Sequence, residues 1–330
     1  MLFQALDDKG QCVGVYVDGK LSFKNIPTGL TSTWDYANFL KDQDINYARL
    51  YCGGQTLDQA CPDHLLDEWH EKSAKLKAFL NSFKESKVSL RENCFFDLVP
   101  ERFLLDFCEI KNEITKYILE NYEKPKNYDF LLQTNVILSK IKQNDLDIDA
   151  DALKNRLHEF KVRQFVNKLD RTNKYIDFNL FGTKTGRLST KKKSFPIMTM
   201  DKAYRKVLRP KNECFVELDF NAAELRTLLA LSGIDQPQED LHDWNINNIF
   251  EGNETREEAK KRIFAWLYNP EAKDHSLDKT YDKRSVVKKY FTGSEVKTCF
   301  DRTIPCDSHH ALNYIIQSTT SDLLLKQMVK

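Results

Sequence analysis

The chain has 330 residues, of which 41% are hydrophobic and 30% are charged. This length and composition indicate two or three folded domains, and they exclude both a small disulfide-stapled scaffold and a globally disordered chain. Its 50 Lys and Arg nearly balance its 49 Asp and Glu.

The predicted elements begin with β structure and continue with helices. The first fifty residues favour strands at 12–17, 21–23 and 47–52, with Asp18-Gly19 as a hairpin turn. Apolar periodicity and proline positions then predict helices at 64–83, 100–122, 128–143 and 149–169. Two further strands are expected at 175–181 and 215–220. The remaining helices are expected at 222–231, 245–250, 256–268 and 311–328. The order indicates a mixed α+β protein.

Cysteine usage and hydropathy indicate in which cellular compartment we expect the protein. None of the eight cysteines forms a C-x-x-C pair, and no apolar run reaches the ~20 residues that a membrane span needs. The first eight residues already contain two aspartates, which is not typical of a signal peptide. We therefore expect a reducing cytoplasm and no membrane partner.

Charge is distributed unevenly along the chain. Residues 1–150 hold 18 basic and 24 acidic residues, whereas residues 151–330 hold 32 and 25. Segment 183–211 has ten basic residues and one acid, among them Lys191, Lys192 and Lys193. Such a segment indicates contact with a polyanion, and a solvated basic loop is the alternative.

Two short segments in this half carry candidate functional residues. The first is TGRLS at 185–189, where glycine permits a tight turn and Arg187 offers a forked donor to phosphate. The second is DFNAAELR at 219–226, where an apolar strand would deliver Asp219 to its end. This carboxylate and the backbone carbonyl of Phe220 are a suitable ligand pair for Mg²⁺. Alternatively, Asn221 caps the following helix with Glu224, and Asp219 is a turn residue.

Two helical patterns follow. Arg256, Lys260, Phe264 and Tyr268 recur every four residues, so they share one helical face. Cations suit a triphosphate and aromatic rings suit stacking on a base, although an amphipathic core helix gives the same pattern. Asn313 and Gln317 also lie four apart, and their amides are able to read base edges or to form ordinary polar surface.

Together and in this order, these segments resemble the family A DNA polymerases, over about residues 175–330. The resemblance implies an incomplete palm-and-fingers architecture. It divides the chain into an N-terminal α+β domain (1–90), a reduced thumb-like helical region (91–174), the first part of the palm (175–235), fingers (236–300) and a return helix (301–330). No Asp-x-Glu strand typical of the family's 3′–5′ exonuclease occurs in residues 1–90, so we expect no proofreading.

The resemblance also implies site residues, which keep their numbers in this sequence. Asp219 would be one of two catalytic aspartates holding two Mg²⁺ ions with the Phe220 carbonyl, and Lys260 would assist the leaving pyrophosphate. The incoming dNTP would contact Glu224 (the steric gate against a ribose 2′-OH), His242, Arg256, Lys260, Phe264 and Tyr268. Primer–template DNA would contact Thr185, Arg187, Lys191, Lys192, Lys193, Arg226, Asn313 and Gln317.

The implied function is addition of dNTPs to a primer 3′-OH in DNA replication or repair. The family's second aspartate lies in an H-D-E hairpin, which these 330 residues do not contain. We therefore expect a split or truncated enzyme, inactive as this isolated chain, whose second polypeptide carries that hairpin. The alternatives are a catalytically inactive DNA-binding or assembly subunit and a single-subunit RNA polymerase, against which Glu224 argues.

Overall fold

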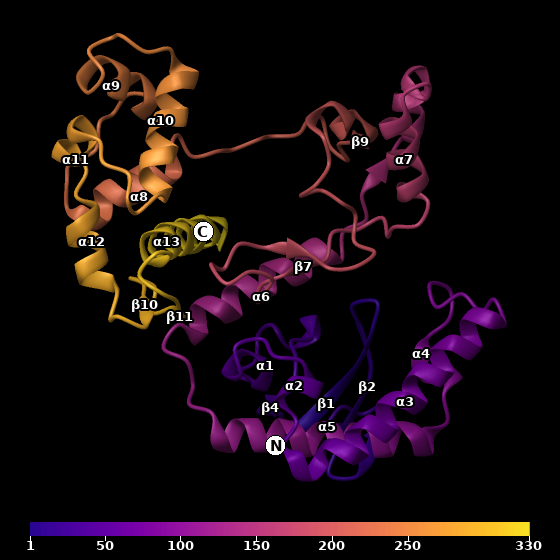
Figure 1. Ribbon diagram of the computed structural model, residues 1–330. Coiled ribbons are helices and arrows are strands. Elements are labelled where there is room, and N and C mark those ends of the chain that lie inside the picture. Colours follow the sequence, from indigo (N-terminus) through magenta and orange to yellow (C-terminus); the bar gives the residue numbers. More distant parts are fainter. Residues whose placement is uncertain (330) are drawn as a thin grey trace. The chain divides into compact units, whose positions relative to one another are not determined.

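The computed structural model describes residues 1–329 and is mixed α and β, as the sequence predicts. It divides into two compact units, Met1–Asp145 and Leu146–Lys330, each of which has its own core (Figure 1). Among residues 1–329, no helix combines the length and apolar character needed to cross a bilayer.

The first unit combines a three-stranded antiparallel sheet with helices. Its strands are β1 (Phe3–Asp8), β2 (Gln11–Val17), β3 (Lys20–Ser22), β4 (Ser32–Thr33) and β5 (Asn46–Tyr47). Its helices are η1 (Asn38–Leu40), α1 (Ala48–Tyr51), α2 (Leu57–Ala60), α3 (Asp63–Glu85), α4 (Phe95–Leu98), α5 (Glu101–Asn121) and α6 (Tyr128–Lys142). Asp18 and Gly19 both have positive φ, so the predicted hairpin turn between β2 and β3 is confirmed.

Helix α5 organises this first unit. Its apolar stripe, which includes the fully buried Ile114 and Ile118, packs against α1, α2, α3 and the β1–β2 hairpin. Because α3 and α5 pack on each other, the expected boundary between residues 90 and 91 falls inside one compact unit. The boundary between the two units of the structure lies between residues 145 and 146, and not between residues 174 and 175, where the expected thumb-like region ends.

The second unit holds short strands and most of the remaining helices. Its strands are β6 (Asp147–Ile148), β7 (Phe178–Asn179), β8 (Ser189–Thr190), β9 (Leu208–Arg209), β10 (Glu295–Lys297) and β11 (Thr303–Pro305). Its helices are η2 (Ala150–Arg156), α7 (Phe160–Leu169), η3 (Lys202–Val207), α8 (Ala223–Ser232), α9 (Leu241–Asn248), α10 (Arg256–Tyr268), α11 (His275–Thr280), α12 (Lys283–Tyr290) and α13 (Ala311–Val329). The strands pair two by two as β6–β9, β7–β8 and β10–β11.

Two apolar clusters stabilise the second unit. One joins η2, α7 and η3 through buried residues such as Leu153 and Phe195. The other brings together the five helices from α8 through α12, the strand β10 and the helix α13, and it includes Leu228, Trp266 and Ile315.

Five predicted elements differ from the structure, two of them only in their bounds. The strand expected at 175–181 is reduced to β7, and the helix expected at 245–250 is α9, which begins at Leu241. Residues 47–52 form mainly the short helix α1, because Ala48, Arg49 and Leu50 are good helix formers. The helix expected over 149–169 is divided into η2 and α7. The strand expected at 215–220 is absent from the described chain: residues 210–222 contain no helix or strand, and Leu218 is 90% exposed. A strand needs a neighbour for its backbone hydrogen bonds, and this segment pairs with none in residues 1–329.

Candidate functional site

The turn before α8 is fixed by Asn221. Its side-chain oxygen accepts a hydrogen bond of 2.9 Å from the backbone N–H of Leu241, and its Nδ2 donates to Asp240 Oδ2 at 2.5 Å. The residue that caps α8 is Ala222, in a left-handed conformation with φ +49° and without a side-chain cap bond. The alternative in which Asn221 and Glu224 form a capping pair is therefore wrong. Asn221 instead joins the start of α8 to the start of α9.

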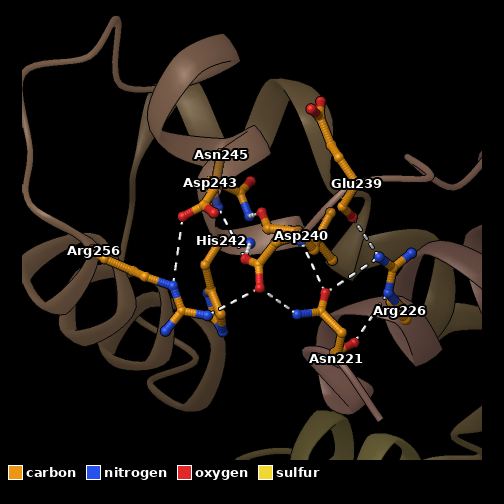
Figure 2. A network of polar contacts seen from close by, with 9 residues as sticks. Asn221, Arg226, Glu239, Asp240, His242, Asp243, Asn245 and Arg256 are labelled. Atoms are coloured by element: carbon orange, nitrogen blue, oxygen red, sulfur yellow. Dashed lines mark hydrogen bonds and ion pairs between the residues drawn. The ribbon is translucent and has the colours of Figure 1, made fainter.

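Asp240 is the hub of this network (Figure 2). One carboxylate oxygen caps α9 by accepting from the N–H groups of His242 (2.9 Å) and Asp243 (3.2 Å). The other accepts from Asn221 and from Arg256 Nη2, at 3.0 Å. Burial acts to raise the pKa of Asp240, but the backbone N–H groups, Arg256 and Asn221 outweigh burial and lower it to about 2. The carboxylate is therefore ionised throughout the neutral range and holds α8, α9 and α10 together.

The two basic residues expected to contact the dNTP here have different environments. Arg256 contacts Asp240 and also Asp243, whose Oδ1 lies 3.5 Å from Arg256 Nε, although 54% of the Arg256 side chain remains exposed. His242 is buried, and its Nδ1 has no hydrogen-bond partner within residues 1–329. Burial and the nearby charge of Arg256 lower the pKa of His242, so the imidazole is neutral at pH 7.

Glu224 joins three of the predicted segments. Its Oε1 accepts a bond of 2.5 Å from Arg187 Nη2, and its Oε2 accepts a bond from the Tyr268 hydroxyl. Glu224 is 17% exposed, and burial together with this carboxylate raises the pKa of Tyr268. The TGRLS segment, the first turn of α8 and the end of α10 therefore meet at one carboxylate.

Helix α10 matches the predicted range at both ends, and its start is fixed by a capping box between Thr255 and Glu258. The rings of Phe264 and Tyr268 are half-buried against the apolar cluster and stack in parallel, with centroids 5.9 Å apart and planes inclined by 5°. The Lys260 ammonium lies 5.9 Å from the Phe264 centroid. This face of α10 thus presents a stacked, half-buried aromatic pair with a cation beside it, next to Glu224.

Helix α13 is tied to the TGRLS segment. Thr185 is buried, and its hydroxyl donates to Gln317 Oε1 at the long distance of 3.4 Å. Asn313 lies one turn earlier on α13, and its Oδ1 is buried without a hydrogen-bond partner in the described residues. The amide pair therefore lies partly inside the protein, with one acceptor unused.

The remaining basic residues do not all converge on this site. Arg226 turns back and donates to carbonyl groups of Asn221, Pro237 and Glu239, so it stabilises the α8–α9 connection. Lys191 lies 3.1 Å from Asp177, while Lys192 and Lys193 are exposed beyond β8. The guanidinium of Arg226 donates five hydrogen bonds within the protein, three of them to these backbone carbonyls. DNA would have to compete with them for Arg226.

The predicted metal ligands make only part of a magnesium site. Asp219 lies at the exposed end of segment 210–222, and its Oδ1 accepts from the backbone N–H of Phe220 at 2.9 Å. Mg²⁺ prefers six oxygen ligands, and residues 1–329 contain no group of three or more His, Cys, Asp or Glu able to hold a metal. Asp219 and the Phe220 carbonyl do not by themselves fit a pair of Mg²⁺ ions.

The sequence analysis missed three residues of this region. Asp240 was detectable as a helix-capping aspartate just before the apolar Leu241. Asp322 stands as a single charge beside the apolar run Leu323-Leu324-Leu325, and a lone charge in such a place needs a partner. That partner is Arg302, which nothing local in the sequence singles out.

No protein-family model matches the chain, and no curated protein matches it either.

Proposed function

We propose that this chain forms the nucleotide-binding part of a template-directed DNA polymerase that resembles family A, with the palm-and-fingers plan which that resemblance implies. One observation carries the proposal. The carboxylate of Glu224 accepts bonds from Arg187 of the TGRLS segment and from Tyr268 of α10, so a segment expected to contact DNA and two segments expected to contact the nucleotide converge on one group.

The face of α10 that carries the four-residue repeat suits a nucleoside triphosphate. A base stacks against the accessible part of the Phe264 and Tyr268 pair, and the triphosphate lies toward Lys260 and Arg256, one and two turns away. Glu224 lies beside Tyr268, where the sugar of such a nucleotide would be. A carboxylate held on both oxygens is rigid, and rigidity is what a group that rejects an additional hydroxyl requires.

Arg256 must exchange partners when a triphosphate binds. In the free protein its guanidinium is bonded to Asp240 and Asp243. A triphosphate carries more charge than one carboxylate and offers the same forked geometry, so it competes for this guanidinium. Lys260 has no such carboxylate among the ion pairs of the described residues, and it is exposed for immediate contact.

In the proposed reaction a primer 3′-hydroxyl attacks the α-phosphate of a dNTP, and pyrophosphate leaves. Divalent cations supply Lewis-acid stabilisation of both oxygens in reactions of this class. Asp219 provides one carboxylate for them. The proposal therefore requires a second carboxylate from outside residues 1–330, on a second polypeptide or on further residues of the same one. Lys260 stabilises the charge on the leaving phosphates.

Binding of a fluorescent dNTP to the chain with primer–template DNA tests the proposal. Lys260→Ala should weaken dNTP binding about tenfold or more, because it removes a charge-assisted contact. The matched control is Lys261→Ala, an exposed lysine of the same helix that lies off the aromatic face, and it should change the affinity less than about twofold. Equal effects of the two substitutions, or no dNTP binding by the wild-type chain, would contradict the proposal.

An inactive DNA-binding subunit is a second candidate, favoured by the lack of a metal-binding cluster in residues 1–329. Primer extension separates the two. We expect extension once the missing carboxylate is supplied by an added polypeptide, and loss of extension in Asp219→Ala. If this protein binds duplex DNA but binds neither dNTP nor the added polypeptide, it is the inactive DNA-binding subunit. Efficient rNTP incorporation would instead indicate an RNA polymerase.

A further inference from the structure

A buried ion pair lies beneath the TGRLS segment. Arg302, in the turn between β10 and β11, forms two parallel bonds with Asp322 of α13. The distances are 3.1 Å from Nε to Oδ2 and 2.6 Å from Nη2 to Oδ1. Asp322 is fully buried and Arg302 is 12% exposed. Both charges are thus removed from water and fixed in a planar, forked arrangement.

Such a pair is a poor way to stabilise a core. Removing each charge from water costs several kcal/mol, and an apolar pair of similar size is often as stable or more so. Burial raises the pKa of Asp322, although the charge and hydrogen bonds of Arg302 act to lower it. The Asp322 carboxylate is therefore largely removed from water. A pair with this cost calls for a role other than packing.

The guanidinium of Arg302 is the surface on which the TGRLS turn rests. A Cβ placed on Gly186 would lie 2.6 Å from Arg302 Cζ and 2.6 Å from Nη2, so only glycine allows this approach. Gly186 also has φ +76°, which favours glycine. Its neighbour Thr185 bonds to Gln317, five residues before Asp322 on α13. The turn therefore contacts α13 directly at Thr185 and, at Gly186, indirectly through Arg302 and its partner Asp322.

The position of this turn sets the position of Arg187. The backbone carbonyl of Arg187 accepts a bond of 3.0 Å from the Thr183 hydroxyl, which closes the turn around Gly186. From there the Arg187 side chain reaches Glu224. The Arg302 guanidinium, which lies against Gly186, is thus connected to the Glu224 carboxylate through the single tight turn at 183–187.

We propose that Arg302 and Asp322 are positioning residues: they hold the turn at 183–187 against α13 and thereby aim Arg187 at Glu224, which sets the selection between deoxyribose and ribose. The selection step rests on the proposed function. The holding of the turn does not, because it concerns only contacts within the protein.

The test replaces the ion pair by apolar residues of similar size, Arg302→Met with Asp322→Leu, in the full chain. We expect the unfolding temperature to stay within a few degrees of wild type, because the apolar pair restores packing without buried charge. Amide hydrogen exchange of residues 183–188 should become about tenfold faster, since the turn loses its support. The preference for dNTP over rNTP in binding should fall about threefold or more.

A matched control is available in the same unit. Arg156 and Glu159 form another forked pair, with distances of 2.6 and 2.8 Å, between η2 and the start of α7. Arg156→Met with Glu159→Gln should leave exchange at 183–188 and the dNTP preference unchanged. Arg302→Lys serves if the double variant fails to fold: it keeps the charge and loses the planar fork, and it should give the same faster exchange.

The outcomes separate this inference from the proposed function. Unchanged exchange at 183–188 in folded Arg302 variants, or an equal change in the Arg156 control, would overturn the positioning role. Faster exchange with an unchanged dNTP preference in a chain that binds dNTP would overturn the link to sugar selection. If the wild-type chain binds no nucleotide, the proposed function fails, and the exchange measurement still decides whether the ion pair holds the turn.

Discussion

Replacing Asp240 by asparagine should remove an electrostatic stabilisation whose size follows from its pKa. The ordinary pKa of 3.8 falls to about 2 in the folded chain. This difference corresponds to about 2 kcal/mol at neutral pH. The side chain is 29% exposed, so solvent screening reduces the expected loss to about 1 kcal/mol. Asparagine remains a good helix cap, so α9 should keep its first turn.

The sign of the pH dependence follows from the direction of the shift. Because the folded pKa lies below the unfolded one, the stabilisation is complete above pH 3.8 and is lost as the pH falls toward 2. About half of it should remain at pH 3. The difference in unfolding free energy between wild type and Asp240→Asn should therefore be about 1 kcal/mol at pH 6 and about half as large at pH 3.

Urea unfolding followed by tryptophan fluorescence measures this difference. In a background with Trp34→Phe and Trp69→Phe, the signal comes from Trp244 and Trp266 of the second unit. A suitable control is Asp243→Asn, whose carboxylate is 57% exposed and 3.5 Å from Arg256, and which should cost less. If wild type and Asp240→Asn differ in unfolding free energy by the same amount at pH 6 and pH 3, the assignment of Asp240 as the hub is refuted. Equal destabilisation by Asp243→Asn would refute it too.

Two other substitutions test contacts of the TGRLS turn and Glu224. Gly186→Ala should lower the unfolding free energy by about 1–3 kcal/mol more than Gly252→Ala in urea titrations, because both glycines have positive φ but only Gly186 faces Arg302. Equal losses would show that the backbone conformation alone matters. Tyr268→Phe should cost about 1–3 kcal/mol, since the Glu224 carboxylate loses a hydrogen bond where burial limits replacement by water. A loss below about 0.5 kcal/mol would mean that this bond contributes little.

Elements with strong local signals could be predicted from the sequence. Helix α10 begins at the predicted residue because Thr255 and Glu258 supply a capping box. Helix α5 begins directly after Pro100, which is a good residue before a first helical turn. The Asp18-Gly19 turn requires two positive φ values, and the sequence there favours them. In each case the information lies within a few residues.

Elements that depend on distant partners could not be predicted in this way. Residues 215–220 have the composition of a strand, but pairing depends on another segment at the right place. The ion pair of Arg302 and Asp322 joins a hairpin turn to a helix, and the convergence of Arg187 and Tyr268 on Glu224 spans 37 and 44 residues along the chain. The family resemblance predicted that these segments share a site, whereas the individual bonds follow only from the fold.

The bonding of the acidic residues also bears on where a divalent cation binds in the proposed enzyme. Glu224 and Asp322 each accept bonds on both oxygens, and so does Asp240, in every case with an arginine among the donors. A cation at any of these three would have to displace an arginine, and the displaced charge would then repel it. The Asp219 carboxylate accepts one bond from the adjacent backbone N–H and pairs with no cation in residues 1–329. Among these acids it therefore offers a metal ion the least electrostatic opposition, and one carboxylate of this kind gives weak binding until a second joins it.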